Sequence, residues 1–297
     1  MTRDRALVDT TALICLCLAA AALAGDLPKL TGPYLGQSPP GSEAVIFAPG
    51  LVSVEGRYEY AASIHPKGDR FLFSAESPDG GAAVHESRMV DGRWTAPAKV
   101  SLTAGAKKSE MEAFFSADGR HVFFAPYDEG MDVRVWVVDV TADGFSKPRP
   151  LGEPVAQDPA FYPVQAADGG LYYTNLAKRT TYRAVLDKGK AKSAEPVGLE
   201  LGGHAYPSPD GSFIVLDSAS LDSEGQRDIF VAYRGDDGSW STPKPLGPEV
   251  NTEHSETCPS LSPDGEYLFF SRYNEPGDVS DIYWVSSEVI RKGPTAD

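Results

Sequence analysis

Acidic side chains recur at one position of the sequence. Three glutamates, Glu59, Glu110 and Glu256, each stand nine residues before a glycine, and the three glycines belong to a repeated phrase. Asp158 and His204 stand near the corresponding place in two further copies. Converging carboxylates can bind a hard cation such as calcium, or supply the acid and the base of glycoside hydrolysis. In a third interpretation, each glutamate accepts hydrogen bonds from nearby backbone N–H groups.

The repeated phrase is a turn followed by an apolar run, and it occurs five times. Its clearest copy is Ser262-Pro263-Asp264-Gly265, followed by Tyr267-Leu268-Phe269-Phe270. An Asp-Gly pair accepts positive φ angles and closes a tight hairpin, and the aromatic run is typical of a strand. The five copies end at Gly68, Gly119, Gly169, Gly211 and Gly265, so the phrase returns every 42 to 54 residues. A period of this length indicates a stacked or radial repeat.

Each repeat then continues with two more strand-like segments. Asp281-Ile282-Tyr283-Trp284 illustrates the third segment, and Asp237-Gly238-Ser239-Trp240-Ser241-Thr242-Pro243 illustrates the fourth. Four antiparallel strands per repeat, arranged radially, make a β-propeller blade. The sequence therefore predicts an all-β protein, a propeller of five four-stranded blades. Six blades are the alternative, because the less regular third repeat around 186–198 could hide another.

The last repeat lacks its fourth strand, and a segment near the N-terminus resembles the missing part. In the segment 44–53, Phe47 and Pro49 take the places of the Trp and the Pro. We therefore expect this segment to pair with the last repeat near 281–288, which removes the exposed sheet edges. The expected organisation is a signal peptide at 1–24, an irregular lead-in at 25–43, the propeller at 44–290 and a tail at 291–297.

A ring of blades places equivalent residues on one circle. Glu59, Glu110 and Glu256 would open the innermost strands of their blades, so they are predicted to line one mouth of the central channel. Asp158 and His204 are predicted to complete this ring. These five residues are the candidate ligand-binding residues, with calcium as the only candidate cofactor, and no residue is assigned a catalytic role.

The first residues resemble an export signal. Arg3 and Arg5 precede an apolar run, and Ala22-Leu23-Ala24 matches a cleavage site before Gly25. Cleavage would remove two of the three cysteines and leave Cys258, so an internal disulfide is not expected. After removal of the signal, no transmembrane span is expected. We therefore predict a periplasmic or secreted protein in which Cys258 packs in the interior.

Charge and missing motifs exclude several classes of protein. The chain has 27 basic and 42 acidic residues, a net charge of −15, which repels nucleic-acid phosphates. It lacks the Gly-x-Ser-x-Gly motif of α/β-hydrolases, a P-loop and the His-Glu-x-x-His motif of zinc peptidases. The four Asp residues of the turns are explained by the hairpins alone.

The phrase Ser262-Pro263-Asp264-Gly265, an aromatic strand and then Asp281-Ile282-Tyr283 resemble the WD40-like PD40 (TolB-type) propeller repeats. This resemblance implies an exported propeller in the cell envelope or outside the cell, and no single activity. We expect a non-catalytic binding scaffold with an envelope protein or a glycan as partner. The alternative is a carbohydrate-active enzyme, similar to a glycoside hydrolase, with a carboxylate site at the channel mouth.

Overall fold

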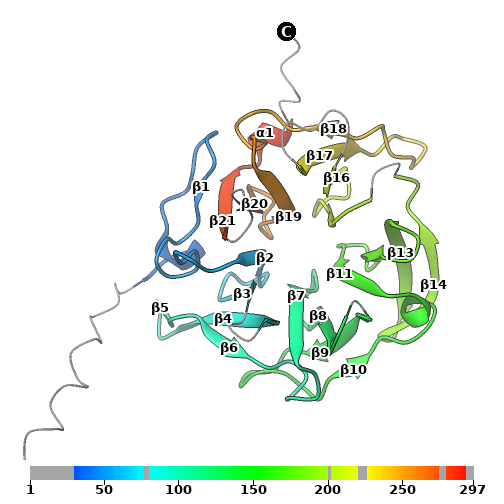
Figure 1. Ribbon diagram of the computed structural model, residues 1–297, viewed down its shortest axis with the longest axis horizontal. Helices are drawn as coiled ribbons and strands as arrows, with labels where there is room; N and C mark the ends of the chain where they lie inside the picture. The colour runs from blue at the N-terminus through cyan, green and yellow to red at the C-terminus, as the bar shows by residue number, and fades with distance from the viewer. Residues whose placement is uncertain are drawn as a thin grey trace, which may run out of the picture.

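The protein is a five-bladed β-propeller, as the sequence predicts. A computed structural model describes residues 30–76, 80–130, 132–199, 202–219, 226–273 and 279–291. Within these residues, five antiparallel sheets stand around a central axis (Figure 1). Four of the sheets have four strands, and the first has five because both β5 and β6 pair with β4.

Each blade runs outward from the axis in chain order. The innermost strands are β2 (Glu59–Ile64), β7 (Ser109–Phe115), β11 (Ala160–Gln165), β15 (Ala205–Pro207) and β19 (Ser255–Leu261). The second strands are β3 (Arg70–Glu76), β8 (His121–Tyr127), β12 (Leu171–Asn175), β16 (Phe213–Ser218) and β20 (Tyr267–Tyr273). The third strands are β4 (Ala82–Val90), β9 (Trp136–Asp139), β13 (Thr180–Asp187), β17 (Asp228–Tyr233) and β21 (Ser280–Ser286).

The outer strands are short in most blades. They are β5 (Arg93–Trp94) with β6 (Ala98–Val100), β10 (Arg149–Pro150), β14 (Lys190–Pro196), β18 (Lys244–Pro245) and β1 (Val45–Ile46). The helical elements are equally short: η1 (Tyr34–Gly36), η2 (Val155–Gln157) and α1 (Glu288–Arg291). The less regular third repeat still forms a complete blade, because β13 and β14 make a long hairpin there. No helix within the described residues is long and apolar enough to cross a membrane.

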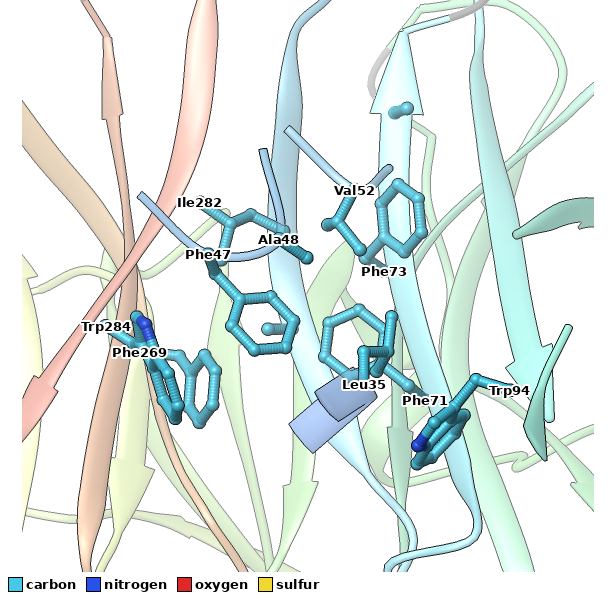
Figure 2. Packing of buried hydrophobic residues seen from close by; sticks show 12 residues of the cluster. Leu35, Phe47, Ala48, Val52, Phe71, Phe73, Trp94, Phe269, Ile282 and Trp284 are labelled. Carbon is cyan, nitrogen blue, oxygen red and sulfur yellow. The ribbon is translucent and has the colours of Figure 1, made fainter. Parts of the chain in front are cut away.

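The ring closes by pairing the start of the chain with its end. Strand β1 supplies the outer edge of the last blade, with Val45 opposite Trp284 and Ile46 opposite Tyr283. Phe47 follows directly and is fully buried. Its ring centroid lies 5.2 Å from those of Phe71, Phe269 and Trp284, so one side chain joins the first blade to the fifth (Figure 2). The predicted closure is confirmed.

The lead-in packs against the propeller over its described part. Leu35 of η1 is 1% exposed and belongs to the same apolar cluster as Phe47. The Tyr34 hydroxyl donates to Asp264, at 2.7 Å, and the Trp94 indole N–H donates to the carbonyl of Gly32, at 2.8 Å. This segment therefore covers the junction at which the ring closes. The predicted signal peptide, 1–24, lies outside the described residues.

The repeated turns explain their own Asp and Gly residues. Gly265 has a φ of +72°, which a glycine adopts without strain. Asp264 Oδ1 accepts hydrogen bonds from the Ser262 hydroxyl, at 2.5 Å, and from the Glu266 backbone N–H, at 3.0 Å. Burial alone would raise the pKa of this carboxyl, but these bonds hold it below its usual value. The Asp carboxylates of the turns therefore stabilise the turns by accepting hydrogen bonds within them.

Candidate functional site

The three predicted glutamates accept hydrogen bonds from loops of their own blades. Glu110 is the clearest case, because its carboxylate accepts from four donors. They are the backbone N–H groups of Leu102 and Thr103, at 2.7 and 2.8 Å, and the hydroxyls of Ser101 and Thr103. The side chain is 5% exposed, so it ties the loop before β7 to the blade.

Glu59 and Glu256 each bind an arginine in addition to the backbone. Glu59 Oε1 accepts from Arg57 Nε, at 2.5 Å, and from the Val54 N–H, at 3.2 Å, whereas its Oε2 has no hydrogen-bond partner among the described residues. Glu256 accepts from Arg272 Nε, at 2.7 Å, and from the Thr252 hydroxyl and N–H. Burial, partly offset by these donors, raises the pKa of Glu59 to about 7 and that of Glu256 in the same direction.

The other two predicted residues occupy different surroundings. Asp158 accepts a hydrogen bond from the side-chain amide of Asn175, at 3.0 Å, within its own blade. His204 lines a cavity at the channel mouth, and none of the other four candidates is among the residues that line it. Cation or sugar binding by the three glutamates and Asp158 stays a prediction.

The channel mouth holds a cavity of about 490 Å³ on the face where the innermost strands begin. This volume falls within the usual range of small-ligand pockets, roughly 300–1,000 Å³. The chain returns to this face at the ends of β3 and β20 and just before β17. The lining residues come from four blades, the first, second, fourth and fifth: Tyr58, Tyr60, Glu76, Glu112, His204, Arg227, Thr257, Cys258 and Tyr273.

A second position of the repeat, seven residues before its glycine, accounts for the side chains that meet near the channel axis. Seven residues before the repeat glycine, the five blades carry Ala61, Glu112, Tyr162, His204 and Cys258. In every blade but the fourth, this residue has a positive φ, between 53° and 56°, and the innermost strand shifts register at the same point. Such a bulge breaks the alternation of side chains and aims one in a new direction.

The bulges also join neighbouring blades through side chains. The Glu112 N–H donates to the Ser74 hydroxyl of the first blade, and the Cys258 N–H donates to Asp217 of the fourth, each at 2.8 Å. The Tyr162 N–H donates to Glu112 Oε2, at 2.7 Å. A non-glycine residue with a positive φ costs of order 1–3 kcal/mol, and these bonds help to hold the strained backbone in place.

Glu112, His204 and Cys258 come from three different blades and meet near the axis. One ligand atom from each lies within 4.8 Å of the others. His204 Nε2 is 3.4 Å from Glu112 Oε1, and His204 Nδ1 is 2.5 Å from Asp217 Oδ2. Asp217 also binds Arg227. The histidine therefore has a carboxylate on each side and a thiol nearby.

The charges of this group are coupled. Burial opposes the charge of the His204 imidazole, but attraction to Asp217 raises its pKa well above the ordinary value. Burial would likewise raise the pKa of the Asp217 carboxyl, but His204 and Arg227 hold it far below the usual range. Burial raises the pKa of the Cys258 thiol. In this arrangement the imidazolium and the Asp217 carboxylate form an ion pair, and Cys258 keeps its proton.

Three tyrosines give the mouth an aromatic side. The ring of Tyr58 packs edge-to-face on Tyr60, with centroids 5.7 Å apart, and lies 6.1 Å from Tyr273. Burial raises the pKa of Tyr58 and of Tyr60, so both hydroxyls remain protonated donors. Glu76 and Arg227 add an acceptor and a donor to the same cavity.

The glutamates nine residues before the glycine form a visible sequence pattern, but most residues that line the mouth lie outside it. The residues that this pattern omits are the lining residues Tyr58, Tyr60, Glu76, Glu112, Arg227, Thr257, Cys258 and Tyr273, together with Asp217, the partner of His204. The signal that could have found Glu112 and Cys258 is their common offset with His204, seven residues before the glycine. Cys258 is buried, as predicted, but it also borders the channel mouth. The three tyrosines carry no comparable signal, because aromatic residues also occur in the second strand of every blade.

The opposite mouth of the channel has a different composition. A cavity of about 360 Å³ lies among the repeated turns, and its lining includes Ile64, Phe115 and the prolines Pro66, Pro207, Pro209 and Pro263. The ionisable cluster around His204 is absent from this lining. The chemistry that the described residues bring together is therefore on the other face.

Comparison with known proteins shows the fold and no more. No family model matches the sequence, and neither does any curated protein. A solved structure described as TolB from Agrobacterium tumefaciens is 18% identical, with a TM-score of 0.49 over 73% of this chain and 71% of that one. A thermostable family-43 glycoside hydrolase is 14% identical, with a TM-score of 0.55 over 79% and 90% of the two chains.

A third similar structure is the Bacteroides ovatus protein named xyloglucan PUL GH43B. It is 14% identical, with a TM-score of 0.52 over 82% of this chain, and the chain spans 54% of its length. Identities this low place the chain among β-propellers without assigning an activity.

Proposed function

We propose that the protein is an exported, non-catalytic β-propeller that binds a short carbohydrate in the channel mouth. The observation that carries this proposal is the convergence of Tyr58, Tyr60 and Tyr273 on one cavity that also contains Arg227 and Glu76. A sugar ring has a flat apolar face and a rim of hydroxyls. The faces of tyrosine rings pack well against the apolar face of a sugar, and a mixture of hydrogen-bond donors and acceptors can bind its hydroxyls.

The size and openness of the mouth support a ligand of this kind. A cavity of about 490 Å³ accommodates one or two sugar rings, with the remainder of a chain extending into solvent. The fold similarity to family-43 glycoside hydrolases makes carbohydrates the first class to test. An envelope protein as a further partner of the scaffold stays a prediction.

Binding is favoured over hydrolysis because of how the acidic residues are engaged. Glu59, Glu110 and Glu256 already accept hydrogen bonds in their own blades. Among the residues that the structure describes, Glu76 and Glu112 are the acidic side chains that line the mouth, so a glycosidase site built from these residues would use them. One observation favours that alternative: burial raises the pKa of Glu76, as in a general acid. Against it, Glu112 is held by the Tyr162 N–H and lies beside His204.

The experiment is a thermal-unfolding screen against a panel of oligosaccharides, followed by titration calorimetry of those that stabilise the protein. A ligand present at 100 times its Kd stabilises the native state by about 2.7 kcal/mol. Tyr273→Ala should weaken binding of the selected sugar about tenfold or more, because it removes an aromatic wall of the mouth.

Tyr182→Ala is the matched control, since this half-buried tyrosine of β13 lies outside the mouth and should leave affinity unchanged. Equal loss of binding in both variants, or no stabilising sugar in the panel, would contradict the proposal. Chromatography of the same mixtures shows whether the sugar is cleaved. Cleavage that Glu76→Gln abolishes would establish the enzymatic alternative in place of the binding scaffold.

A further inference from the structure

We propose that Glu112, His204 and Cys258 form a binding site for a zinc-class divalent metal ion at the base of the channel mouth. This inference does not depend on carbohydrate binding. It rests on three side chains of residue types that bind metal ions, one from each of three blades, which lie close together. Their ligand atoms lie within 4.8 Å of one another, and within the described residues no other group of three is as close.

The distances agree with a tetrahedral site. Zinc binds histidine nitrogen and carboxylate oxygen at about 2.1 Å, which places those two ligand atoms about 3.4 Å apart. His204 Nε2 and Glu112 Oε1 are 3.4 Å apart in the structure. A thiolate and an imidazole on zinc stand about 3.6 Å apart. The separations that involve Cys258 therefore need to shorten by about 1.2 Å at most.

Each ligand is already oriented by a second contact. Asp217 accepts from His204 Nδ1, which directs Nε2 toward Glu112 and Cys258. Metal-bound histidines commonly have a carboxylate on the other ring nitrogen, which fixes the tautomer and the ring orientation. Glu112 uses Oε2 for the Tyr162 N–H and keeps Oε1 for the site. The Cys258 N–H donates to the same Asp217.

The donor set selects the kind of metal. Sulfur, nitrogen and one carboxylate oxygen suit zinc and neighbouring first-row ions. Calcium prefers six to eight oxygen ligands, which this group does not offer. When the ion binds, the Cys258 thiol and the imidazolium each release one proton to solvent. The 2+ ion then balances the thiolate and the Glu112 carboxylate, and His204 keeps the Nδ1 proton that it shares with Asp217.

The site would have an open coordination position. The His204 side chain is 18% exposed and lines the cavity, so an ion bound to it would be accessible from the mouth. Three protein ligands and one exchangeable position are the arrangement in which zinc can bind water or a ligand oxygen.

The test is zinc titration of the untagged full chain carrying Cys15→Ser and Cys17→Ser, so that Cys258 is the only thiol. We expect one zinc per chain, and cobalt(II) should give a thiolate-to-metal charge-transfer band. Cys258→Ser should abolish the band and weaken zinc binding about 100-fold or more. His204→Asn is the second ligand variant. Asp217→Asn, which alters a positioning residue, should weaken binding about 10- to 100-fold.

His121→Ala is the matched control. His121 also has a carboxylate at Nδ1, Asp139 at 2.9 Å, but it does not belong to a cluster of three ligand residues in the described part of the chain. Its zinc affinity should match that of the parent protein. Circular dichroism of each metal-free variant establishes that it is folded. Absence of stoichiometric zinc binding, or binding that folded Cys258→Ser and His204→Asn variants retain, would overturn the proposal.

Discussion

Replacing Glu110 by glutamine should lower the free energy of unfolding by about 2–4 kcal/mol. The carboxylate accepts from four donors, and an amide can accept only through its one oxygen. If that oxygen keeps Thr103 and Ser101, the buried Leu102 N–H faces an NH₂ group and loses its acceptor. Such a loss costs about 1–3 kcal/mol, and the remaining bonds lose their charge assistance, about 1 kcal/mol more.

Calorimetry and urea unfolding measure this change directly. A loss of 1 kcal/mol lowers the Tm of a protein of this size by about 2 °C, so Glu110→Gln should lower it by about 4–8 °C. Glu129→Gln is the control, because that side chain is 85% exposed and forms a surface ion pair with Lys108. It should change stability by less than about 0.5 kcal/mol.

The same experiment separates the structural role from cation binding. If Glu110 only ties down its loop, calcium will leave the difference between the variant and the parent protein unchanged. An unaltered or increased stability of Glu110→Gln would refute the argument from its four donors. Calcium that stabilises the parent protein and not the variant would establish Glu110 as a cation ligand, as the sequence alone suggested.

Three other predictions concern the buried Glu59, the closure of the ring and the export signal. The folded-state pKa of Glu59 is raised to about 7, so the folded protein binds the extra proton and stability should fall by about 3 kcal/mol between pH 4.5 and 7. Glu59→Gln should remove that part of the pH dependence in urea unfolding at pH 5 and 8, and parallel curves for the two proteins would contradict it. Phe47→Ala should destabilise the ring closure by about 3–5 kcal/mol, and deletion through Ser53 should cause aggregation in size-exclusion chromatography. A deletion variant that stays monomeric with an unchanged Tm would count against this. Mass spectrometry of protein from the cell envelope or medium should find Gly25 as the first residue, whereas an intact Met1 on cytoplasmic protein would argue against export.

The propeller was predictable because its signals are local. A turn that ends in glycine before an aromatic strand specifies a hairpin from a few residues; four of its five copies are Asp-Gly and the first is Lys67-Gly68, and the five copies indicate the number of blades. The closure by β1 followed from counting strands, since the last repeat lacked one. The packing of η1 was not predictable, because Tyr34 and Asp264 are 230 residues apart and their contact has no local pattern.

The candidate site was harder to predict because bulges decide which side chains reach the axis. The glutamates nine residues before the glycine are bound within their blades, whereas three of the residues seven before it, Glu112, His204 and Cys258, line the channel mouth. A bulge of one residue changes the face of the strand on which a side chain lies, and no local sequence pattern at Glu112 or Cys258 predicts the bulge. His204 was identified, but its partners Asp217 and Glu112 come from a second strand and another blade.

The most direct test of the central claim is a crystal structure of the protein soaked with the oligosaccharide that stabilises it most. We expect density for a sugar ring against Tyr58 and Tyr273, with its hydroxyls directed toward Arg227 and Glu76. Density only among the turns at the opposite mouth, on the outer faces of the blades, or nowhere on the molecule would contradict the assignment of the channel mouth as the ligand site.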